Sequence, residues 1–403
     1  MTVGPTAQER AMKVREVMLR AMSGELTWVQ AGEILGYTSR TIRRWKWRLE
    51  HDGPNRLFDR RCRPSPRRIP GATVRRIVRL YRTRYQGFNV RHFHALLRRE
   101  HQVELSYTFV RQTLQEAGLV KRKRPRGRHR LRRDPRRCFG EMLHLDGSPH
   151  RWLAHCPDER ATLISVVDDA TRRLLYAQLV GSESTEAVLA ALYAVIAAFG
   201  VPMALYTDRA SWAAHTPVQG QPIDPTRITQ VGRALRRLGV QHILAYSPQA
   251  RGRSERANRT IQGRLVNELR IARVRTLEGA NRYLLERFVP AYNEEFAVPA
   301  SDPASAFVTA GGADLDQILC FEEPRAVGKD NIVQWERLKL QLPRQPGRSS
   351  CAGLPVLVRR HLDRSLSVWN GPQRLARYGP EGKLMPVSTT APTAARKGRS
   401  VAA

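Results

Sequence analysis

The chain of 403 residues carries 69 Lys and Arg residues against 36 Asp and Glu residues, a formal net charge of +33. Its 41% hydrophobic content is enough for folded cores, which excludes a wholly disordered or collagen-like chain, and its length suggests two or three domains. So large a positive excess repels itself unless a polyanion neutralises it, which argues against a small-molecule metabolic enzyme and makes nucleic acid the expected partner.

Residues 1–140 hold 35 basic and 11 acidic residues, a pattern typical of DNA-binding modules attached to a larger body. Within them, residues 10–50 predict a helix-turn-helix. Thr27 followed by Gln30 is a capping-box start, Gly36 interrupts, and a basic second helix begins near Ser39. The second helix of this motif enters the DNA major groove, although a small helical hairpin with a solvated basic face is the alternative. The expected DNA contacts are Arg40, Thr41, Arg43, Arg44 and Lys46, with Ile42 and Trp45 in the core.

An Arg- and Pro-rich stretch over residues 51–70 predicts an extended linker on DNA phosphates. Apolar stripes at helical spacing follow, and Ser106 is the expected cap of a further helix that stops at Gly118, so a second helix-turn-helix is predicted. The same region offers histidines as metal ligands, but no cysteine or carboxylate cluster stands at ligand spacing beside them. These histidines are His92, His94 and His101.

Residues 121–137 contain 11 basic residues among 17 and are expected to bind phosphate in a salt-dependent way. The run marks a domain boundary near residue 138. The DNA contacts expected from it are Lys121, Arg122, Lys123 and Arg124.

From residue 139 the pattern changes to β-branched and apolar runs. The first three runs, at residues 142–145, 162–167 and 174–180, predict an antiparallel meander. An Ala-rich helix over about 184–199 is followed by strands at 203–207 and 241–245 and by a long helix over about 252–273. Strands followed by strand–helix alternation predict a mixed sheet with helices packed on it, and residues 275–300 are expected to add helical cover.

Beyond about residue 325 short β-like stretches are separated by Gly, Pro and Asn. They predict a small C-terminal β-barrel, followed by a disordered tail. The stretches are residues 332–335, 354–358, 366–369 and 375–378.

The chain shows no sign of a membrane or an oxidising compartment. The uncharged run 187–206 is about long enough to span a bilayer, but Gly200 and Pro202 break it, and the N-terminus lacks the apolar core of a signal peptide. A reducing cytoplasm is therefore expected. Five scattered cysteines without a CxxC pair support neither a disulfide framework nor a zinc ribbon: Cys62, Cys138, Cys156, Cys320 and Cys351.

Three acidic residues stand where predicted elements begin or end. Asp146 lies in the first strand, Asp208 follows the fourth, and Glu255 opens the long helix. A buried unpaired carboxylate is costly, and a divalent cation removes this cost because Mg²⁺ prefers hard oxygen ligands. Two ions roughly 4 Å apart would stabilise both the attacking and the leaving oxygen of an in-line phosphoryl displacement.

Four motifs in this order resemble those of DDE transposases and retroviral integrases. They are His144 to Ser148, Val167 to Arg172, Tyr206 to Arg209 and Gly252 to Arg256. With its two preceding helical modules, the chain resembles bacterial insertion-sequence transposases of the ISNCY type over about residues 25–380. The resemblance implies a central α/β ribonuclease H-like catalytic domain with a mixed five-stranded sheet.

The resemblance also implies roles. Asp146 would bind both of two Mg²⁺ ions (Mn²⁺ being the alternative), with Asp208 completing one site and Glu255 the other. The reaction would be hydrolysis of a phosphodiester at the element's ends, followed by attack of the freed 3′-OH on target DNA. Binding of the terminal repeats by the N-terminal modules and synapsis of two ends imply at least a homodimer.

Two departures from the family pattern bear on these roles. The gap between Asp208 and Glu255 is longer than in compact integrases and predicts an inserted loop over residues 211–227. Many relatives carry Lys or Arg seven residues after the glutamate, where this chain has Gln262. Arg259 or Arg264 is therefore expected to contact the DNA end.

Other residues remain alternatives for the acidic and metal sites. Asp168 and Asp169 could be the ligands, although adjacent Asp residues more often shape a hairpin turn. Glu268 lies on the same long helix and is an alternative third acid. A zinc site of irregular spacing would use His150, His155, Cys156 and Cys138.

The sequence therefore predicts a multidomain DNA transposase. The alternatives are a decayed or domesticated transposase that only binds DNA, and a nuclease without strand transfer. The expected domains are two helix-turn-helix modules (1–60 and 61–120), a basic linker (121–138), the catalytic domain (139–300), a β-barrel-like domain (325–380) and a disordered tail (381–403).

Overall fold

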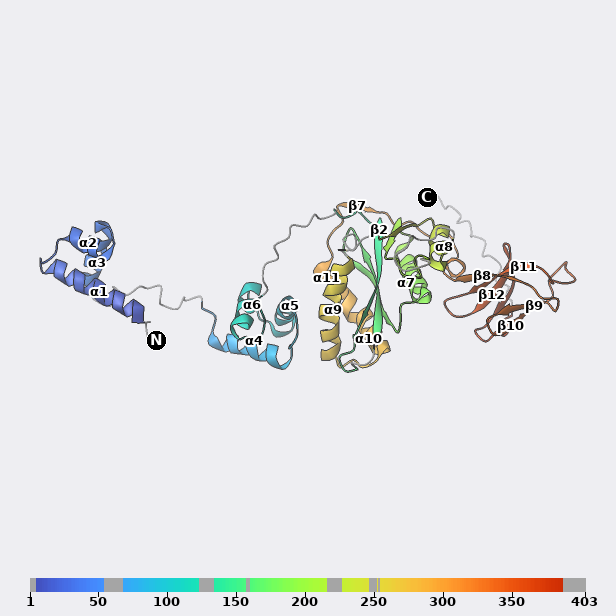
Figure 1. The fold of residues 1–403 in the computed structure, drawn as a ribbon, viewed down its shortest axis with the longest axis horizontal. Coiled ribbons are helices and arrows are strands. Elements are labelled where there is room, and N and C mark those ends of the chain that lie inside the picture. Colours follow the sequence, from blue (N-terminus) through green and yellow to red (C-terminus); the bar gives the residue numbers. More distant parts are fainter. Residues whose placement is uncertain are drawn as a thin grey trace, which may run out of the picture. The chain divides into compact units, whose positions relative to one another are not determined.

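The computed structural model describes residues 5–53, 68–122, 134–156, 160–215, 227–245, 252 and 254–386. The chain forms two compact units, Met1–Arg79 and Leu80–Ala403. Figure 1 shows the course of the chain through both. Within the described residues no helix is long and apolar enough to cross a membrane.

The first unit contains the predicted helix-turn-helix. Thr27 caps the second helix and forms the expected reciprocal capping box with Gln30, and Gly36 ends that helix in the left-handed region at φ 69°. Ile42 is fully buried and Trp45 packs against the same core, as predicted. A preceding helix, which the sequence analysis did not predict, adds Val17 to this core. The helices are α1 (Pro5–Met22), α2 (Trp28–Leu35) and α3 (Ser39–Asp52).

Three further helices follow, and the first of them crosses the boundary between the two units. Ser106 caps the third by accepting from the amide of Phe109, as predicted. The rings of Tyr81 and Phe93 meet edge to face at 5.0 Å in the core. Gln102, at φ 54°, ends the second helix. The helices are α4 (Gly71–Thr83), α5 (Val90–His101) and α6 (Tyr107–Glu116).

The second unit is built around a mixed five-stranded sheet, as predicted. Its strand order is β4-β3-β2-β5-β6. Within this sheet, β2, β3 and β4 form the expected antiparallel meander, and β5 and β6 run parallel to β2 and to each other. The strands are β2 (Met142–His150), β3 (Ala161–Asp168), β4 (Leu174–Val180), β5 (Ala204–Thr207) and β6 (Gln241–Leu244).

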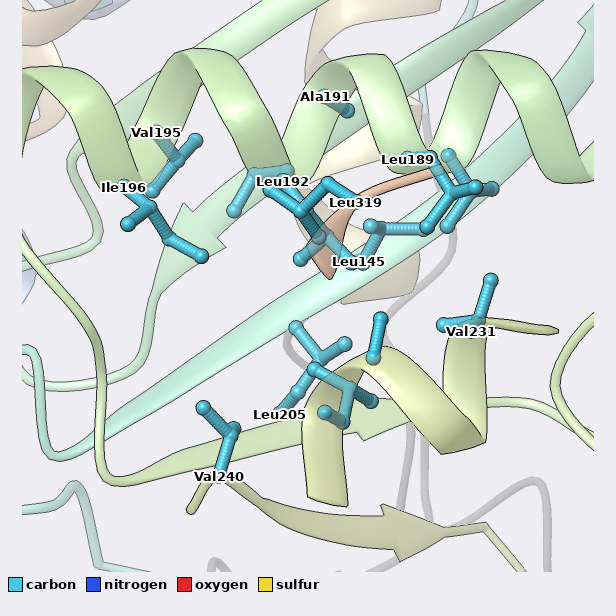
Figure 2. Packing of buried hydrophobic residues seen from close by; sticks show 14 of the residues in the cluster. Leu145, Leu189, Ala191, Leu192, Val195, Ile196, Leu205, Val231, Val240 and Leu319 are labelled. Atoms are coloured by element: carbon cyan, nitrogen blue, oxygen red, sulfur yellow. The ribbon is translucent and has the colours of Figure 1, made fainter. Parts of the chain in front are cut away.

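Helices cover both faces of this sheet (Figure 1). On one face, Leu145 of β2 and Leu205 of β5 pack against Leu192 and its neighbours (Figure 2). On the other face, Ile261 and Leu265 pack against residues of β3 and β4. The first face carries α7 (Thr185–Phe199) and α8 (Gln230–Arg237), and the second α9 (Ser254–Ile271), α10 (Leu277–Tyr283), the π-helical η4 (Leu284–Phe288) and α11 (Val289–Phe296).

The predicted small C-terminal β-barrel is not confirmed. In the described residues its strands form two separate sheets, a four-stranded antiparallel sheet in the order β13-β12-β11-β8 and a hairpin of β9 and β10, around one core. Pro324 lies in the edge strand β8, which was not predicted because its sequence is charged. The strands are β8 (Phe321–Ala326), β9 (Ile332–Trp335), β10 (Leu338–Gln341), β11 (Pro355–Arg360), β12 (Leu366–Asn370) and β13 (Gln373–Tyr378).

A connecting segment and an ion-pair cluster join these strands to the five-stranded sheet. The segment holds β7 (Asp302–Ser305), which pairs with β1 (Cys138–Phe139), and the short α12 (Leu315–Ile318). Glu322 of β8 accepts from Arg237 of α8 at 2.9 Å and from Arg359 of β11 at 2.8 Å. The ion pairs thus link α8 to the C-terminal sheet.

Candidate active site

Two of the predicted acids belong to neighbouring parallel strands: Asp146 lies in the middle of β2, and Asp208 directly follows β5. β2 and β5 pair in a constant register, with Met142 opposite Ala204 and His144 opposite Tyr206. The recorded pairs end at His144 and Tyr206, and the same register continued by two residues would put Asp146 level with Asp208, just past the end of β5. Asp146 is 5% exposed. The pairing of β2 with β5 therefore places the two acids on neighbouring strands at the level where β5 ends.

The Asp146 carboxylate is held by the long helix. Asn258 of α9 donates from Nδ2 to Asp146 Oδ2 at 2.7 Å, and its Oδ1 accepts from Ser165 Oγ at 3.2 Å. All three side chains are buried. Sequence reasoning missed Asn258, although its position three residues after Glu255 puts both side chains on neighbouring positions of one helix face.

The loop after β5 orients the second acid. The half-buried Asp208 accepts from the backbone amide of Ala210 at 3.0 Å through Oδ1. Just before it, the Thr207 hydroxyl donates to the Asp208 carbonyl at 2.9 Å and lies 2.9 Å from Nε2 of His242 in β6. Burial lowers the pKa of His242, which favours the neutral ring.

Glu255 lies in the first turn of α9 and is exposed. In the described residues, no three His, Cys, Asp or Glu side chains are gathered closely enough to hold a metal ion. The structure therefore places Asp146 and Asp208 on neighbouring strands but does not gather Glu255 into a ligand set with them. Part of the Gly252 to Arg256 motif (Arg253), together with residues 246–251, lies outside the described residues.

The position seven residues after Glu255 has a structural contact. Gln262 donates from Nε2 to Ser148 Oγ at 2.8 Å, so this side chain joins α9 to β2. Arg264 makes a bidentate pair with Glu295 at 2.5 and 2.6 Å and is 11% exposed. Arg259, by contrast, is exposed.

Glu268, the alternative third acid, lies near the C-terminal end of α9. Its Oε1 is 2.8 Å from Nε2 of His92, and its Oε2 accepts from the Tyr283 hydroxyl at 2.9 Å. Burial and this carboxylate raise the pKa of Tyr283. Nearby, Arg270 donates to the carbonyl of Gln86 at 2.7 Å. Glu268 thus takes part in a contact between α9 and the helices that precede the sheet.

Asp168 and Asp169 lie at the turn after β3. Asp168 accepts from the amide of Gly140 at 3.0 Å and from the amide and hydroxyl of Thr171, each at 2.7 Å. Asp169 accepts from the amide of Arg136 at 2.7 Å and lies 2.7 Å from His144 Nε2 in a fully buried pair. Burial raises the pKa of Asp168 against these hydrogen bonds. Both carboxylates thus shape the turn and hold the start of the domain.

The histidines and cysteines proposed as metal ligands bind separately to other groups. His94 Nε2 lies 2.7 Å from the carbonyl of Leu105, and His101 Nε2 lies 2.9 Å from the Tyr85 hydroxyl. His155 Nε2 lies 3.1 Å from the carbonyl of Arg270. Cys156 donates to the carbonyl of Arg275, Cys138 lies in β1, and His150 meets the Trp152 ring at 5.3 Å.

The expected DNA-binding residues of the first unit lie on α3. Arg40, Arg43 and Arg44 are exposed. Lys46 lies 3.6 Å from Glu50 and 5.0 Å from the centre of the Trp28 ring, and Thr41 shares a hydrogen bond with Thr38. In the basic linker, Lys121 and Arg122 are exposed, whereas Lys123 and Arg124 lie outside the described residues.

Solved structures of retroviral integrases resemble the chain weakly. The HTLV-2 integrase catalytic core domain in complex with magnesium, in its trimeric form, has a TM-score of 0.28 and 16% identity, over 37% of this chain and 87% of that one. The simian T-cell lymphotropic virus intasome in complex with PP2A regulatory subunit B56 gamma has a TM-score of 0.31 and 13% identity, over 76% of this chain and 97% of that one.

Sequence comparison finds closer similarity. A family described as a helix-turn-helix domain matches residues 15–67. The transposase for insertion sequence IS1202 of Streptococcus pneumoniae is 30% identical over 271 residues, 59% of this chain and 57% of that protein. The putative transposase y4bF of Sinorhizobium fredii (strain NBRC 101917 / NGR234) is 33% identical over 373 residues, 90% of this chain and 79% of that protein. The last match spans nearly the whole chain.

Proposed function

The chain belongs to the insertion-sequence transposases of the DDE transposase and retroviral integrase superfamily, and from this premise we propose that it cuts and joins DNA with Asp146, Asp208 and Glu255. The observation that carries this proposal is the β2–β5 register, which supports a shared site for Asp146 and Asp208. Glu255 completes the set from the first turn of α9, one turn before the side chain that contacts Asp146.

The donor set fits a hard divalent cation, because carboxylate oxygens are the ligands that Mg²⁺ prefers. Asp146 would contribute to two ion sites, with Asp208 in one and Glu255 in the other. When bound, two Mg²⁺ or Mn²⁺ ions would stabilise the attacking and leaving oxygens of the phosphoryl displacement.

The chain's own groups orient these acids. The Asn258 amide holds Asp146 Oδ2 and the Ala210 amide holds Asp208 Oδ1, so both carboxylates keep a defined rotamer before any substrate arrives. Gln262 and Ser148 lock the helix that carries Glu255 onto the strand that carries Asp146. Preorganisation of this kind lowers the cost of assembling the reactive geometry.

DNA is the partner, and we propose that the basic helix α3 binds the ends of the element. Arg40, Arg43 and Arg44 are exposed there and suited to phosphates and base edges. In the second unit, the exposed Lys121 and Arg122 are assigned to further phosphate contacts. Arg259, an exposed cation one turn after Glu255 on α9, is assigned to the DNA end. Pairing of two element ends requires at least a dimer, acting at DNA in the bacterial cytoplasm.

The proposal is tested by nicking and strand transfer of labelled element-end DNA with Mg²⁺. Asp146→Asn, Asp208→Asn and Glu255→Gln should each lower cleavage by at least about 10³-fold while DNA binding persists. Glu278→Gln, on a highly exposed glutamate of α10, is the matched control and should cleave like wild type. If Glu255→Gln alone still cuts, Glu255 is not the third acid and Glu268 is tested next; a wild type that binds but never cuts would favour a decayed DNA-binding protein.

A further inference from the structure

A carboxylate that the acidic triad does not include lies against the strand of Asp146. Glu183 belongs to the short loop between β4 and α7, and its carboxylate fills the space beside Gly147. A Cβ added at Gly147 would overlap Oε2, Cδ and Oε1 of Glu183. Glycine is therefore required next to Asp146 for this carboxylate to reach the strand.

The same carboxylate binds the loop that follows Asp208. Trp212 donates from Nε1 to Glu183 Oε1 at 2.7 Å, and its ring is 4% exposed in the core under α7. The amides of Ala213 and Ala214 both donate to the carbonyl of Ala210, at 2.8 and 3.0 Å. Ala210 is also the residue whose amide holds Asp208. The turn that orients Asp208 is thus anchored by the Trp212 indole.

Glu183 lies on the opposite face of the sheet from the Asp146 side chain and from α9, which carries Glu255. Asp146 and Ser148 face α9, where Asn258 and Gln262 contact them. Gly147 alternates to the α7 face, as Leu145 does. The Glu183 carboxylate therefore lies against Gly147 on the α7 face, between Asp146 and Ser148, whose side chains point to α9. From this face it can support the strand but is not placed as a metal ligand.

We propose that Glu183 is a positioning residue for the cleavage reaction, acting through a joint made of Glu183, Gly147 and Trp212. The joint ties the residue after Asp146 to the turn after Asp208, and so fixes the separation of the two aspartates. This inference rests on the proposed function, since it deepens the account of the same site. It predicts that loss of the joint speeds amide exchange in the turn after Asp208 and raises the Mg²⁺ concentration needed for cleavage.

Two measurements on the full chain test the joint. The first is amide hydrogen exchange of residues 210–214, which needs no activity, and the second is the Mg²⁺ dependence of element-end cleavage. Glu183→Ala should speed exchange in this turn by about 10-fold and slow cleavage by about 10-fold or more, with a raised Mg²⁺ midpoint. Trp212→Phe, which keeps an aromatic ring and removes the donor, should act in the same direction.

Conservative and double variants separate support from charge. Glu183→Gln keeps the size and an oxygen acceptor, so it should stay within about 3-fold of wild type in both measurements. Gly147→Ala should behave like Glu183→Ala because it displaces the carboxylate, and Gly147→Ala combined with Glu183→Ala should be no worse than the single variants. Glu186→Gln, a nearby glutamate that pairs with Arg360, is the control and should change neither measurement.

The outcomes are decisive in either direction. Unchanged exchange in Glu183→Ala overturns the joint whatever the cleavage result. Suppose that Glu183→Gln cleaves as slowly as Glu183→Ala while amide exchange in residues 210–214 stays slow. Cleavage would then require the negative charge of Glu183 itself, and the proposed joint would also be overturned. If wild type does not cleave, the proposed function fails, while the exchange measurement still decides whether the joint exists.

Discussion

The aspartates of the five-stranded sheet are held in different ways. Asp168 and Asp169 accept from three backbone amides, those of Gly140, Thr171 and Arg136, at the turn after β3. Asp146, in contrast, accepts from a side-chain amide that reaches it from α9. Asp168 and Asp169 therefore hold backbone in place, whereas Asp146 is bound to the helix that also carries Glu255.

This difference distinguishes the turn-forming Asp168 and Asp169 from Asp146, which we propose to be catalytic. Backbone amides cannot move without moving the fold, so acids that accept from several of them stabilise a turn. The orientation of Asp146 depends instead on how α9 packs on the sheet, because its donor is a side chain of that helix. We therefore expect variants of Asp169 to lose stability and variants around Asp146 to lose activity.

The largest effect is expected at the buried pair of His144 and Asp169. Asp169→Ala leaves the His144 ring without its carboxylate and removes an acceptor of the Arg136 amide. It should lower the free energy of unfolding by about 3–5 kcal/mol, as when one partner of a buried pair is removed. Urea unfolding followed by tryptophan fluorescence measures this. The control is Asp363, whose side chain is 60% exposed, and Asp363→Ala should lower the free energy of unfolding by less than about 1 kcal/mol. Equal losses for Asp169→Ala and Asp363→Ala would contradict the structural role of Asp169.

The next effect is expected at Asn258. Asn258→Leu removes the donor to Asp146 while keeping the volume, and should slow cleavage about 10- to 100-fold, as the loss of outer partners of metal ligands does. Gln262→Leu removes a comparable amide contact on the same helix, but to Ser148, and should cost less than about 5-fold. Initial cleavage rates at saturating Mg²⁺ test this. Equal losses for Asn258→Leu and Gln262→Leu would contradict the role of Asn258 in orienting Asp146.

A smaller effect should separate Arg264 from Arg259. Arg264→Lys breaks the bidentate pair with Glu295 and should cost about 1 kcal/mol of unfolding free energy with little change in DNA affinity. Arg259→Ala should weaken binding of element-end DNA and reduce the slope of its salt dependence by about 1. Binding titrations at several salt concentrations distinguish them, and a reduced slope for Arg264→Lys would reverse the assignment.

The smallest effect is a pH dependence from His242. Burial lowers its pKa below the unfolded value of 6.5, so the unfolded chain takes up the proton first as the pH falls. This contribution to stability is present above pH 6.5 and is lost as the pH falls from there through the folded pKa. Thermal unfolding between about pH 8 and pH 5 should show it. His242→Gln keeps a donor for Thr207 and should flatten this part of the profile; an unchanged profile would assign the effect elsewhere.

What the sequence by itself determined was local. The capping box at Thr27 and the Ser106 cap specify the starts of their helices because each cap bonds within three residues. The β-branched and apolar runs between residues 142 and 180 specify strands because such runs can be recognised from consecutive residues alone. The resemblance added three acids in order. Strand β8 escaped prediction because an edge strand tolerates charge and proline.

Tertiary structure decided how distant residues meet. The β2–β5 register, continued two residues past His144 and Tyr206, puts Asp146 level with Asp208 across a long gap in the sequence, and a shift of one residue would turn one of them to the other face. Other contacts likewise depend on the packing of elements far apart in the chain. They are the hydrogen bonds of Asn258 with Asp146 and of Tyr283 with Glu268, and the contact of Glu183 with Gly147. The sequence around each residue does not predict these contacts, because the two partners meet only when the helices pack on the sheet.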